Sequence, residues 1–256
     1  MASIGLKRLA WAQMASEPDN GVPTYGAGMI LGKAVSTSLS ITTAEGELYA
    51  DDMLAEYVSE FSSAQLTAEA DNIPLDKQAM LYGAAYSGGE MQMSADDTPP
   101  YGGWGGYQVL MVGGVRKYRT WFFPKGKANI PDWNGATKGA NVSFGTQPID
   151  VKVMAPNFGP WYYVKEFDNE AAASAYIDSK LNVSTWYNVD VQLQGSGSAV
   201  PGGSTPVAAG EDYTLTITGT VSKLYDNGTD KTASISEGVY TIADVAADHN
   251  IAIIFS

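Results

Sequence analysis

The sequence predicts a mainly β protein with two domains, and three observations lead to this prediction. Glycine, proline and tyrosine are abundant, at 28, 12 and 15 residues. Many short alternating segments are separated by turn signals. A Gly/Ser/Pro-rich stretch at residues 195–210 then separates a long N-terminal part from a short C-terminal part. With 256 residues, the chain is long enough for a large β domain and a small appended one.

Charge and composition exclude several classes of function. The formal net charge is −13, whereas proteins that grip nucleic acid through its phosphates carry clustered Lys and Arg. The chain has no cysteine, which excludes disulfides, zinc–thiolate sites and thiol catalysis. No apolar run approaches the ~18 residues of a membrane span, and no signal-peptide pattern follows Lys7 and Arg8. We therefore expect a soluble protein that folds in the cytoplasm, without membrane insertion.

The segment at residues 34–43 alternates between two kinds of side chain, which is typical of a strand with one buried face. The face expected to be buried carries Val35, Thr37, Leu39 and Ile41. The face expected to meet water carries the small hydroxyl groups of Ser36, Ser38, Ser40 and Thr42.

A cluster of acids follows this strand. Residues 47–56, ELYADDMLAE, contain four acidic side chains, and residues 57–70 again have the pattern of an extended segment. The apolar phase of that second segment shifts partway along it, which predicts a β-bulge near Ser62–Ala64. We therefore expect residues 34–70 to form a long hairpin with the acidic cluster near its tip.

Two helices are predicted in the middle of the chain. Residues 72–83 have Pro74 in the first turn and Gly83 as a stop signal. Residues 167–181 show apolar side chains at helical spacing, with an N-cap expected at Asp168.

Further strands are predicted between these helices. Residues 107–123 indicate a hairpin in which Gly113-Gly114 supply the positive φ angles of a two-residue turn. Residues 141–154 indicate two short strands separated by Pro148. The glycine-rich segment 101–107, YGGWGGY, lacks the Lys-Ser/Thr of a phosphate-binding loop. We expect it to be a flexible strand entrance in which Trp104 packs.

The C-terminal part is expected to form a small β domain. It contains four or five short strands, in DYTLTITGTVSKLY, KTASIS, GVYTIADV and NIAIIF, with turns at Asn227-Gly228 and Glu237-Gly238. We divide the chain into an N-terminal domain at 1–182, a connector and flexible linker at 183–210, and this small domain at 211–256. Because so short a domain is near the lower limit for a self-supporting fold, it is alternatively expected to begin near residue 183.

The sequence contains no convincing catalytic or metal site. The pairs Asp51-Asp52 and Asp96-Asp97 would point to opposite faces of a strand, so neither forms the facing carboxylate couple of a glycosidase. The only histidine, His249, is expected in an exposed turn without partners for a catalytic triad. No spacing matches a calcium loop. We therefore predict that the protein is not an enzyme and uses no cofactor or metal.

Opposite charges are concentrated in two regions of the N-terminal part. Residues 45–97 contain twelve acids and one lysine, while residues 116–138 contain six bases and one acid. Subunits that bind one another head to tail or in rings use complementary regions of this kind. The alternatives for the basic region are a charged outer strand face, or aromatic and basic residues that stack on nucleic-acid bases, which the net charge disfavours.

Five segments occur in a recognisable order within residues 1–182. They are MASIGLKRLAWAQM, GKAVSTSLSITTAEGELYADD, YGGWGGYQVLMVGGVRKYRTWFFPKGKANIP, TKGANVSFGTQPIDVKVM and FDNEAAASAYI. Together they resemble the major tail proteins, or tail tube proteins, of long non-contractile-tailed bacteriophages. No single segment is a chemical fingerprint, so the resemblance depends on the ordered set.

The resemblance implies a fold and an assembly. The fold would be a tail-tube-type β-sandwich or half-barrel with one or two flanking α-helices, and the small C-terminal domain would be an immunoglobulin-like decoration. Six copies would form a ring, and stacked rings would form a tube that conducts the genome during ejection. The protein would assemble in the host cytoplasm and reside in the tail of the virion. Its partners would be further copies, other phage tail proteins and passing DNA, bound without sequence specificity.

Two sets of residues acquire roles within this interpretation. The hydroxyl face of Ser36, Ser38, Ser40 and Thr42 would line the lumen, because uncharged walls let polyanionic DNA slide. Contacts between subunits or rings are predicted at Leu48, Tyr49, Asp51, Asp52, Glu56, Arg116, Lys117 and Arg119.

The main alternative is a surface or secreted β-sandwich module that binds carbohydrate. It would use exposed aromatic residues such as Trp104, Trp133 or Trp161. The absence of a signal-peptide pattern argues against it.

Overall fold

The computed structural model describes residues 2–130 and 145–256, and strands dominate both ranges. This confirms the predicted mainly β fold class. The chain divides into two compact units. Unit 1 comprises Met1–Pro74 and Thr98–Val183, and unit 2 comprises Leu75–Asp97 and Ser184–Ser256.

A nine-stranded sheet forms most of unit 1. Its strands are β1 (Ala2–Ser16), β2 (Thr24–Tyr25), β3 (Met29–Gly32), β4 (Ala34–Ala50), β5 (Met53–Ala70), β8 (Tyr101–Val112), β9 (Val115–Ala128), β10 (Gln147–Val153) and β11 (Tyr163–Phe167). Their order is β2-β1-β8-β9-β10-β5-β4, with β3 beside β1 and β11 beside β9. Strand β4 therefore lies at one end of the sheet and has an unpaired edge.

The sheet curves, so that β1 and β4, far apart in its order, approach within 8 Å between Cα atoms. Two hydrogen bonds hold the start of β4 beside the end of β5. The Asp71 N–H donates to the Lys33 carbonyl at 2.9 Å, and the Lys33 N–H donates to Asp71 Oδ1 at 2.8 Å. The indoles of Trp11 and Trp104 are fully buried, with ring centroids 6.3 Å apart. The curved sheet is a half-barrel, as predicted.

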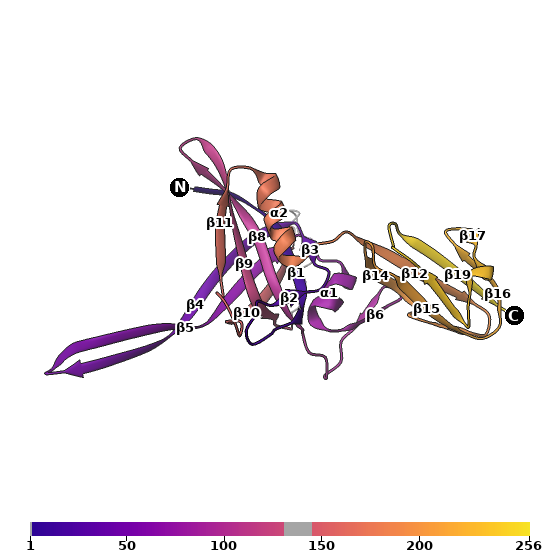
Figure 1. Ribbon diagram of the computed structural model, residues 1–256, viewed down its shortest axis with the longest axis horizontal. Coiled ribbons are helices and arrows are strands. Elements are labelled where there is room, and N and C mark those ends of the chain that lie inside the picture. The colour runs from indigo at the N-terminus through magenta and orange to yellow at the C-terminus, as the bar shows by residue number, and fades with distance from the viewer. Residues whose placement is uncertain (1, 131–144) are drawn as a thin grey trace, which may run out of the picture. The chain divides into compact units, whose positions relative to one another are not determined.

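Helix α2 (Glu170–Leu181) covers one face of this sheet, as Figure 1 shows. Its buried Ile177 and Leu181 pack with Ala10 and Ala12 of β1 and with Phe122 of β9. Burial of a large aliphatic side chain stabilises a fold by about 1.5–3 kcal/mol. The helix is therefore an integral part of the core of unit 1.

The N-cap of α2 is Asn169, and the prediction of Asp168 is wrong. The Ala172 N–H donates to Asn169 Oδ1 at 2.8 Å. Asp168 instead forms an ion pair with Lys117 of β9. Both residue types are good N-caps, so only the tertiary pairing of Asp168 decides between them. At the other end, Asn182 has a left-handed φ of 48°, which is typical of a helix terminus.

The glycine-rich segment is the first part of strand β8, and Trp104 packs there as predicted, with a fully buried side chain. A Cβ at Gly105 would lie 3.2 Å from Leu181 and 3.3 Å from Ile177, both on α2. A Cβ at Gly102 would lie 2.2 Å from Trp11 Nε1. Glycine is therefore required because the helix and the indole approach this strand closely.

Strand β10 contains Pro148, so the prediction of two strands separated by this residue is wrong for the described part. Pro148 opposes Glu69 of β5, while β9 pairs with β10 only at residues 151–153. The missing N–H of proline is tolerated where one edge of a strand is free. The first predicted strand of this pair, near residue 141, lies outside the described residues.

Unit 2 is a two-sheet sandwich accompanied by a short helix and a hairpin. Its elements are α1 (Leu75–Tyr82), β6 (Ala85–Ser87), β7 (Glu90–Gln92), β12 (Trp186–Gln194), β13 (Ser198–Val200), β14 (Gly203–Ala208), β15 (Tyr213–Thr218), β16 (Val221–Asp226), β17 (Thr229–Asp230), η1 (Thr232–Ser234), β18 (Val239–Ile242) and β19 (His249–Phe255). One sheet has the order β14-β12-β19-β16-β17 and the other β13-β15-β18, while β6 pairs with β7. Val189, Leu215, Leu224 and Ile251 are fully buried in the shared core.

The predicted flexible linker at 195–210 is wrong, because strands β13 and β14 lie within it. Strand β14 pairs with β12, and β13 pairs with β15. Its apolar side chains Ala199, Val207 and Ala208 are buried. The composition is that of a linker, but three apolar residues at the correct positions are sufficient to place both strands in the sandwich.

The division of the chain falls between Val183 and Ser184, at the alternative start that the sequence suggests for the C-terminal domain. Unit 2 also includes residues 75–97, which the sequence assigns to the N-terminal domain. The Ser87 Oγ of β6 donates to the Gly202 carbonyl at 3.1 Å. This association joins segments more than a hundred residues apart, so no local pattern reveals it.

The three predicted two-residue turns are confirmed. Both residues have positive φ in Gly113-Gly114 (57° and 81°), Asn227-Gly228 (48° and 75°) and Glu237-Gly238 (51° and 77°). Such angles match the twist of antiparallel strands. The stop signal of α1 is confirmed as well, since Gly83 has φ 71°.

Two local predictions in unit 2 are wrong. KTASIS is not a strand, because Thr232 Oγ1 donates to Asp230 Oδ1 at 2.6 Å and the chain turns into η1. His249 is not in an exposed turn. It begins β19, its Nδ1 lies 2.8 Å from Asp226 Oδ1, and the Tyr240 hydroxyl donates to the other carboxylate oxygen at 2.8 Å.

Candidate assembly surface

Residues 43–61 form a two-stranded ribbon that no other strand of the described residues joins, and we call it the arm. Strands β4 and β5 pair along their whole length, but β10 joins β5 only from Ala64 to Ala70. The pairing skips Ser62, which confirms the predicted bulge there. Figure 1 shows this hairpin continuing beyond the other strands of its sheet.

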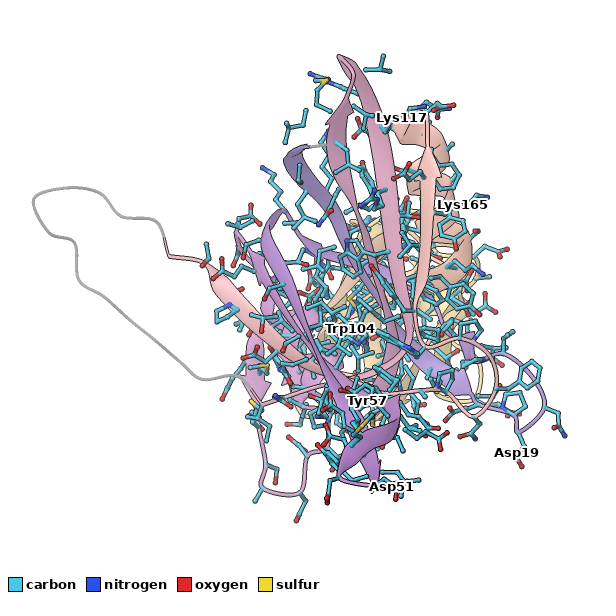
Figure 2. The ribbon with its side chains drawn as sticks, turned by 90° about the vertical axis from the view of Figure 1, so that its left-hand side faces the viewer. Asp19, Asp51, Tyr57, Trp104, Lys117 and Lys165 are labelled. Atoms are coloured by element: carbon cyan, nitrogen blue, oxygen red, sulfur yellow. The ribbon has the colours of Figure 1, made fainter. Side chains whose placement is uncertain are left out.

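The tip of the arm is a tight turn formed by Asp51 and Asp52. Their φ angles are 52° and 63°, and the flanking residues Ala50 and Met53 pair with each other. Aspartate tolerates this left-handed conformation better than most residues. The acidic cluster ELYADDMLAE is therefore two paired strands and a two-residue turn, with Asp51 at the end of the hairpin in Figure 2.

The arm exposes large apolar side chains on both faces. Their exposed fractions range from 47% at Val58 to 71% at Met53. On one face, Tyr49 and Leu54 stand directly opposite each other. The full set is Leu48, Tyr49, Met53, Leu54, Tyr57 and Val58. Because a lone two-stranded ribbon is marginally stable in water and a contiguous apolar surface marks an interaction site, the arm has the properties of a docking element.

The arm is also strongly acidic. It carries six carboxylates and no lysine or arginine. The carboxylates are those of Glu45, Glu47, Asp51, Asp52, Glu56 and Glu60. A partner surface for the arm must therefore be apolar and must carry positive charge at its edge.

Aromatic rings anchor the base of the arm. The ring of Phe61 stacks on the indole of Trp161, with centroids 3.9 Å apart and planes 9° apart. Trp161 continues the stack to Tyr162 at 5.3 Å, and Tyr162 lies 4.8 Å from Phe123 of β9. The arm thus leaves the body of unit 1 from a fixed point.

The predicted hydroxyl face exists as one face of β4. Ser36, Ser38, Ser40 and Thr42 are all exposed and oppose polar residues of β5. Ser36 Oγ donates to Glu69 Oε2 at 2.8 Å. The polar face continues onto β10, where Asp150 Oδ1 accepts from Thr67 Oγ1 at 2.6 Å. Its role as a lumen lining stays a prediction.

The opposite face of β4 is only partly buried, so the prediction for that face is partly wrong. Thr37 and Leu39 are half-buried against Ala68 and Leu66, which are fully buried on β5. Val35 and Ile41, in contrast, are 50% and 52% exposed. Within residues 2–130 and 145–256, nothing buries these two side chains of the edge strand.

Two of the three predicted cationic contact residues are already paired within the chain. Lys117 forms an ion pair with Asp168, and Arg119 Nη2 lies 2.6 Å from Glu166 Oε1 of β11. Arg116 is exposed and has no ion pair with a residue that the structure describes. Of the two acids in these pairs, Asp168 was assigned to the start of a helix, and Glu166 was given no role in the sequence prediction. Arg116 is consequently the strongest of the three as an intermolecular contact.

The tryptophans of the carbohydrate alternative do not form a platform. Trp104 is fully buried, so its predicted exposure is wrong. Trp161 is half-buried and stacks on Phe61. Trp133 lies outside the described residues. A Cβ at Gly126 of β9 would lie 2.9 Å from Trp104 Nε1, so a glycine on the neighbouring strand leaves space for this indole.

A pocket of about 290 Å³ lies beside the C-terminal end of α2. The rings of Tyr25, Phe122, Phe158 and Tyr163 line it, and Lys180 Nζ lies 4.9 Å from the Tyr163 ring centroid. The other lining residues are Val22, Pro23, Thr24, Pro124, Ser179 and Asn182. Burial raises the pKa of the Tyr25 phenol, which stays a donor and binds the Pro124 carbonyl at 2.7 Å. The sequence predicted no role for this pocket.

Among residues 2–130 and 145–256, no group of three acidic or histidine side chains is placed to hold a metal ion. Within the same ranges, no helix has the length and apolar character needed to cross a membrane. No known protein-family model and no curated protein sequence matches the chain significantly.

Proposed function

We propose that this protein is a structural subunit of a bacteriophage tail tube, in which copies of the chain form hexameric rings that stack around a conduit for DNA. The observation that carries the proposal is the arm. It exposes six large apolar side chains, and no strand in the described part of the chain pairs with it. Stable burial of this surface requires another molecule. The choice of a tail tube, and of six copies, comes from the ordered sequence segments that resemble tail tube proteins.

The unpaired edge of β4 supports the same proposal. An exposed edge of 17 residues is a template for pairing with another chain. Closure of several subunits into one barrel removes such edges. The exposed hydroxyl face of this strand would then face the interior of the ring, where uncharged groups avoid binding DNA phosphates.

Negative-stain electron microscopy of the purified full chain over a concentration series tests the proposal. We expect rings or tubes with an open centre at high concentration. A matched pair of variants localises the contact. Met53→Ser and Leu54→Ser together should abolish rings, whereas Val200→Ser, at an equally exposed apolar residue of unit 2, should leave them intact. A chain that stays monomeric at every concentration, and that is retained on a glycan array, would instead favour the carbohydrate-binding alternative.

A further inference from the structure

We infer that the pocket beside α2 receives the tip of the arm of a second copy of this chain. This inference rests on the proposed assembly and names the surface to which the arm binds. The arm of the same chain does not fill its own pocket, since Tyr49 is 63% exposed and does not line it.

At the tip of the arm, a pair of apolar side chains lies next to two carboxylates. Tyr49 and Leu54 are a directly opposed cross-strand pair, so their side chains lie next to each other on one face. Asp51 and Asp52 follow immediately at the turn. A surface that binds the tip must stack on the phenol ring of Tyr49 and place a cation a few ångströms from the turn.

The pocket has both properties. Four aromatic rings line it, and two of its apolar side chains, Val22 and Phe158, are exposed at 57% and 49%. Lys180 reaches over the rings of Phe122, Tyr163 and Tyr176 and forms no ion pair with any carboxylate in the described ranges. The volume of the pocket beside α2, about 290 Å³, is at the lower end for ligand pockets. This volume suits one aromatic side chain with an aliphatic neighbour.

A second pocket of unit 1 is a poorer match. It is lined by Leu6, Lys7, Arg8, Ile30, Gly32, Lys33, Ala34 and Tyr107, and so has a single aromatic ring. Two of its three cations are already neutralised within the chain. Lys7 pairs with Glu170 and Arg8 pairs with Asp178, each at 2.7 Å. Shape and charge therefore both favour the pocket beside α2.

In the resulting contact, the Tyr49 ring stacks on the aromatic walls, and the Lys180 ammonium meets the carboxylates of Asp51 and Asp52. Aromatic stacking and a partly desolvated ion pair contribute together. The two partner surfaces lie on different parts of unit 1, so the contact is heterologous and propagates from copy to copy.

Photo-cross-linking tests the inference directly. In the full chain, Tyr49 is replaced by p-benzoylphenylalanine, which keeps an aromatic ring at this exposed position. Assemblies are irradiated, and the linked peptides are identified by mass spectrometry. We expect intermolecular links to residues 22–25, 158–163 or 179–182. The same replacement at Tyr57, farther from the tip, is the matched control and should link outside these segments.

Three results would overturn the inference. They are links from position 49 to residues 6–8 or 30–34, links to any other surface, and an absence of intermolecular links in assembled protein. In each case microscopy still shows the assemblies, so the proposed function stands. If the unmodified chain never assembles, the proposed function fails first, and the two failures are therefore distinguishable.

A charge exchange tests the inference without a cross-linker. Lys180→Glu should raise the concentration for half-maximal assembly about tenfold, because it places like charges together. Adding Asp52→Lys should restore assembly to within about threefold of the natural chain, since only residues in contact couple in this way. Lys165→Glu is the control, because Lys165 also lies over aromatic rings, at 4.9 Å from the Phe167 centroid, but does not line the pocket. Additive losses in the double variant would contradict the contact, and thermal unfolding verifies that each variant is folded.

Discussion

The ring of Phe61 lies flat on the indole of Trp161, at a centroid distance of 3.9 Å and an interplanar angle of 9°. Phe61 is the last residue of the arm, and Trp161 precedes β11, so the stack connects the arm to the body of unit 1. It also sits next to the bulge at Ser62, where the pairing of β4 and β5 changes register. The direction in which the arm leaves the sheet is therefore set by one bulge and one ring pair.

Phe61→Ala should lower the free energy of unfolding of unit 1 by about 1–2 kcal/mol, because it removes an aromatic pair and leaves space beside Trp161. Denaturant titration measures this loss. Tyr57→Ala is the control, since Tyr57 is 51% exposed within the arm, and should cost less than about 0.5 kcal/mol. Equal losses in the two variants would show that the stack does not anchor the arm.

The least exposed ion pair between carboxylate and lysine in the described ranges joins Glu17 to Lys125. The distance is 2.6 Å, and their side chains are 16% and 15% exposed. Burial opposes ionisation of Glu17, but hydrogen bonds from Lys125 and from the Asn157 N–H outweigh it and lower the pKa of this carboxyl. A carboxyl with a lowered pKa stabilises the fold above its unfolded pKa, and this stability is lost as the pH falls through the folded pKa.

Glu17→Gln should therefore lower the free energy of unfolding by about 1–2 kcal/mol at pH 7. The reason is that the largely buried ammonium group of Lys125 is left without its carboxylate partner. The difference from the natural chain should shrink as the pH is lowered below about 4, because the unfolded carboxyl takes up its proton there, while the folded carboxyl, with its lowered pKa, does so only at lower pH. Glu170→Gln, in an ion pair with far more exposed side chains, is the comparison and should change little. A difference that is constant between pH 7 and pH 3 would contradict the assigned role of the charge.

Arg8 has a left-handed backbone, with φ 60°, at a bulge where β1 and β8 change register. The bulge directs its guanidinium to Asp178 of α2, with Nε to Oδ1 at 2.8 Å and Nη2 to Oδ2 at 2.7 Å. Arg8→Ala loses the two-bond pair and keeps the strained backbone. Arg8→Gly also loses the pair but adopts positive φ without strain.

We expect Arg8→Ala to be less stable than Arg8→Gly by about 1 kcal/mol, measured by chemical denaturation. In a strand without positive φ the order is reversed, because glycine is the weaker strand residue. A more stable alanine variant would therefore show that Arg8 is not held in the left-handed region in solution.

Gly102→Ala should prevent correct folding of unit 1 or cost more than about 3 kcal/mol, because the new Cβ would lie 2.2 Å from Trp11 Nε1 and 2.6 Å from the Ala12 carbonyl. Gly46→Ala is the matched control. Nothing lies within 4 Å of a Cβ at Gly46, which is on the exposed arm. Circular dichroism and tryptophan fluorescence during unfolding measure both. Similar stability of the two variants would contradict the close packing of β8 on Trp11.

Much of the local structure was predictable because it depends on interactions between residues that are close in sequence. The strand at residues 34–43, the phase change near Ser62 and the turn at Gly113-Gly114 each depend on neighbours along the chain, and all three match the structure, although Val35 and Ile41 of that strand are not buried as predicted. Helix α2 was predictable for the same reason, although its cap was assigned one residue too early. Asp168 and Asn169 are equally suitable N-caps by residue type. The choice between them depends on Lys117 of β9, which pairs with Asp168.

The candidate site was predictable in position but not in form. The acidic segment was correctly placed at the tip of a hairpin, yet its tight turn and its exposed apolar faces depend on where β10 stops pairing with β5. Lys117 and Arg119 were expected to be free for a partner, because their acids, Asp168 just after β11 and Glu166 on β11, lie 47 or more residues away. The pocket beside α2 gathers residues from four separate segments, so no single segment predicts it.

The sequence by itself determined most of the strands and turns, and it showed that the arm carries six carboxylates and no lysine or arginine. These properties arise from interactions between residues close in sequence. Only the tertiary structure decided that β13 and β14 belong to a sandwich, that the glycines of β8 accommodate a helix and an indole, and that Lys180 forms no ion pair with a carboxylate of the described residues. Packing between distant segments sets all three, because close contact and charge pairing depend on which surfaces meet in space.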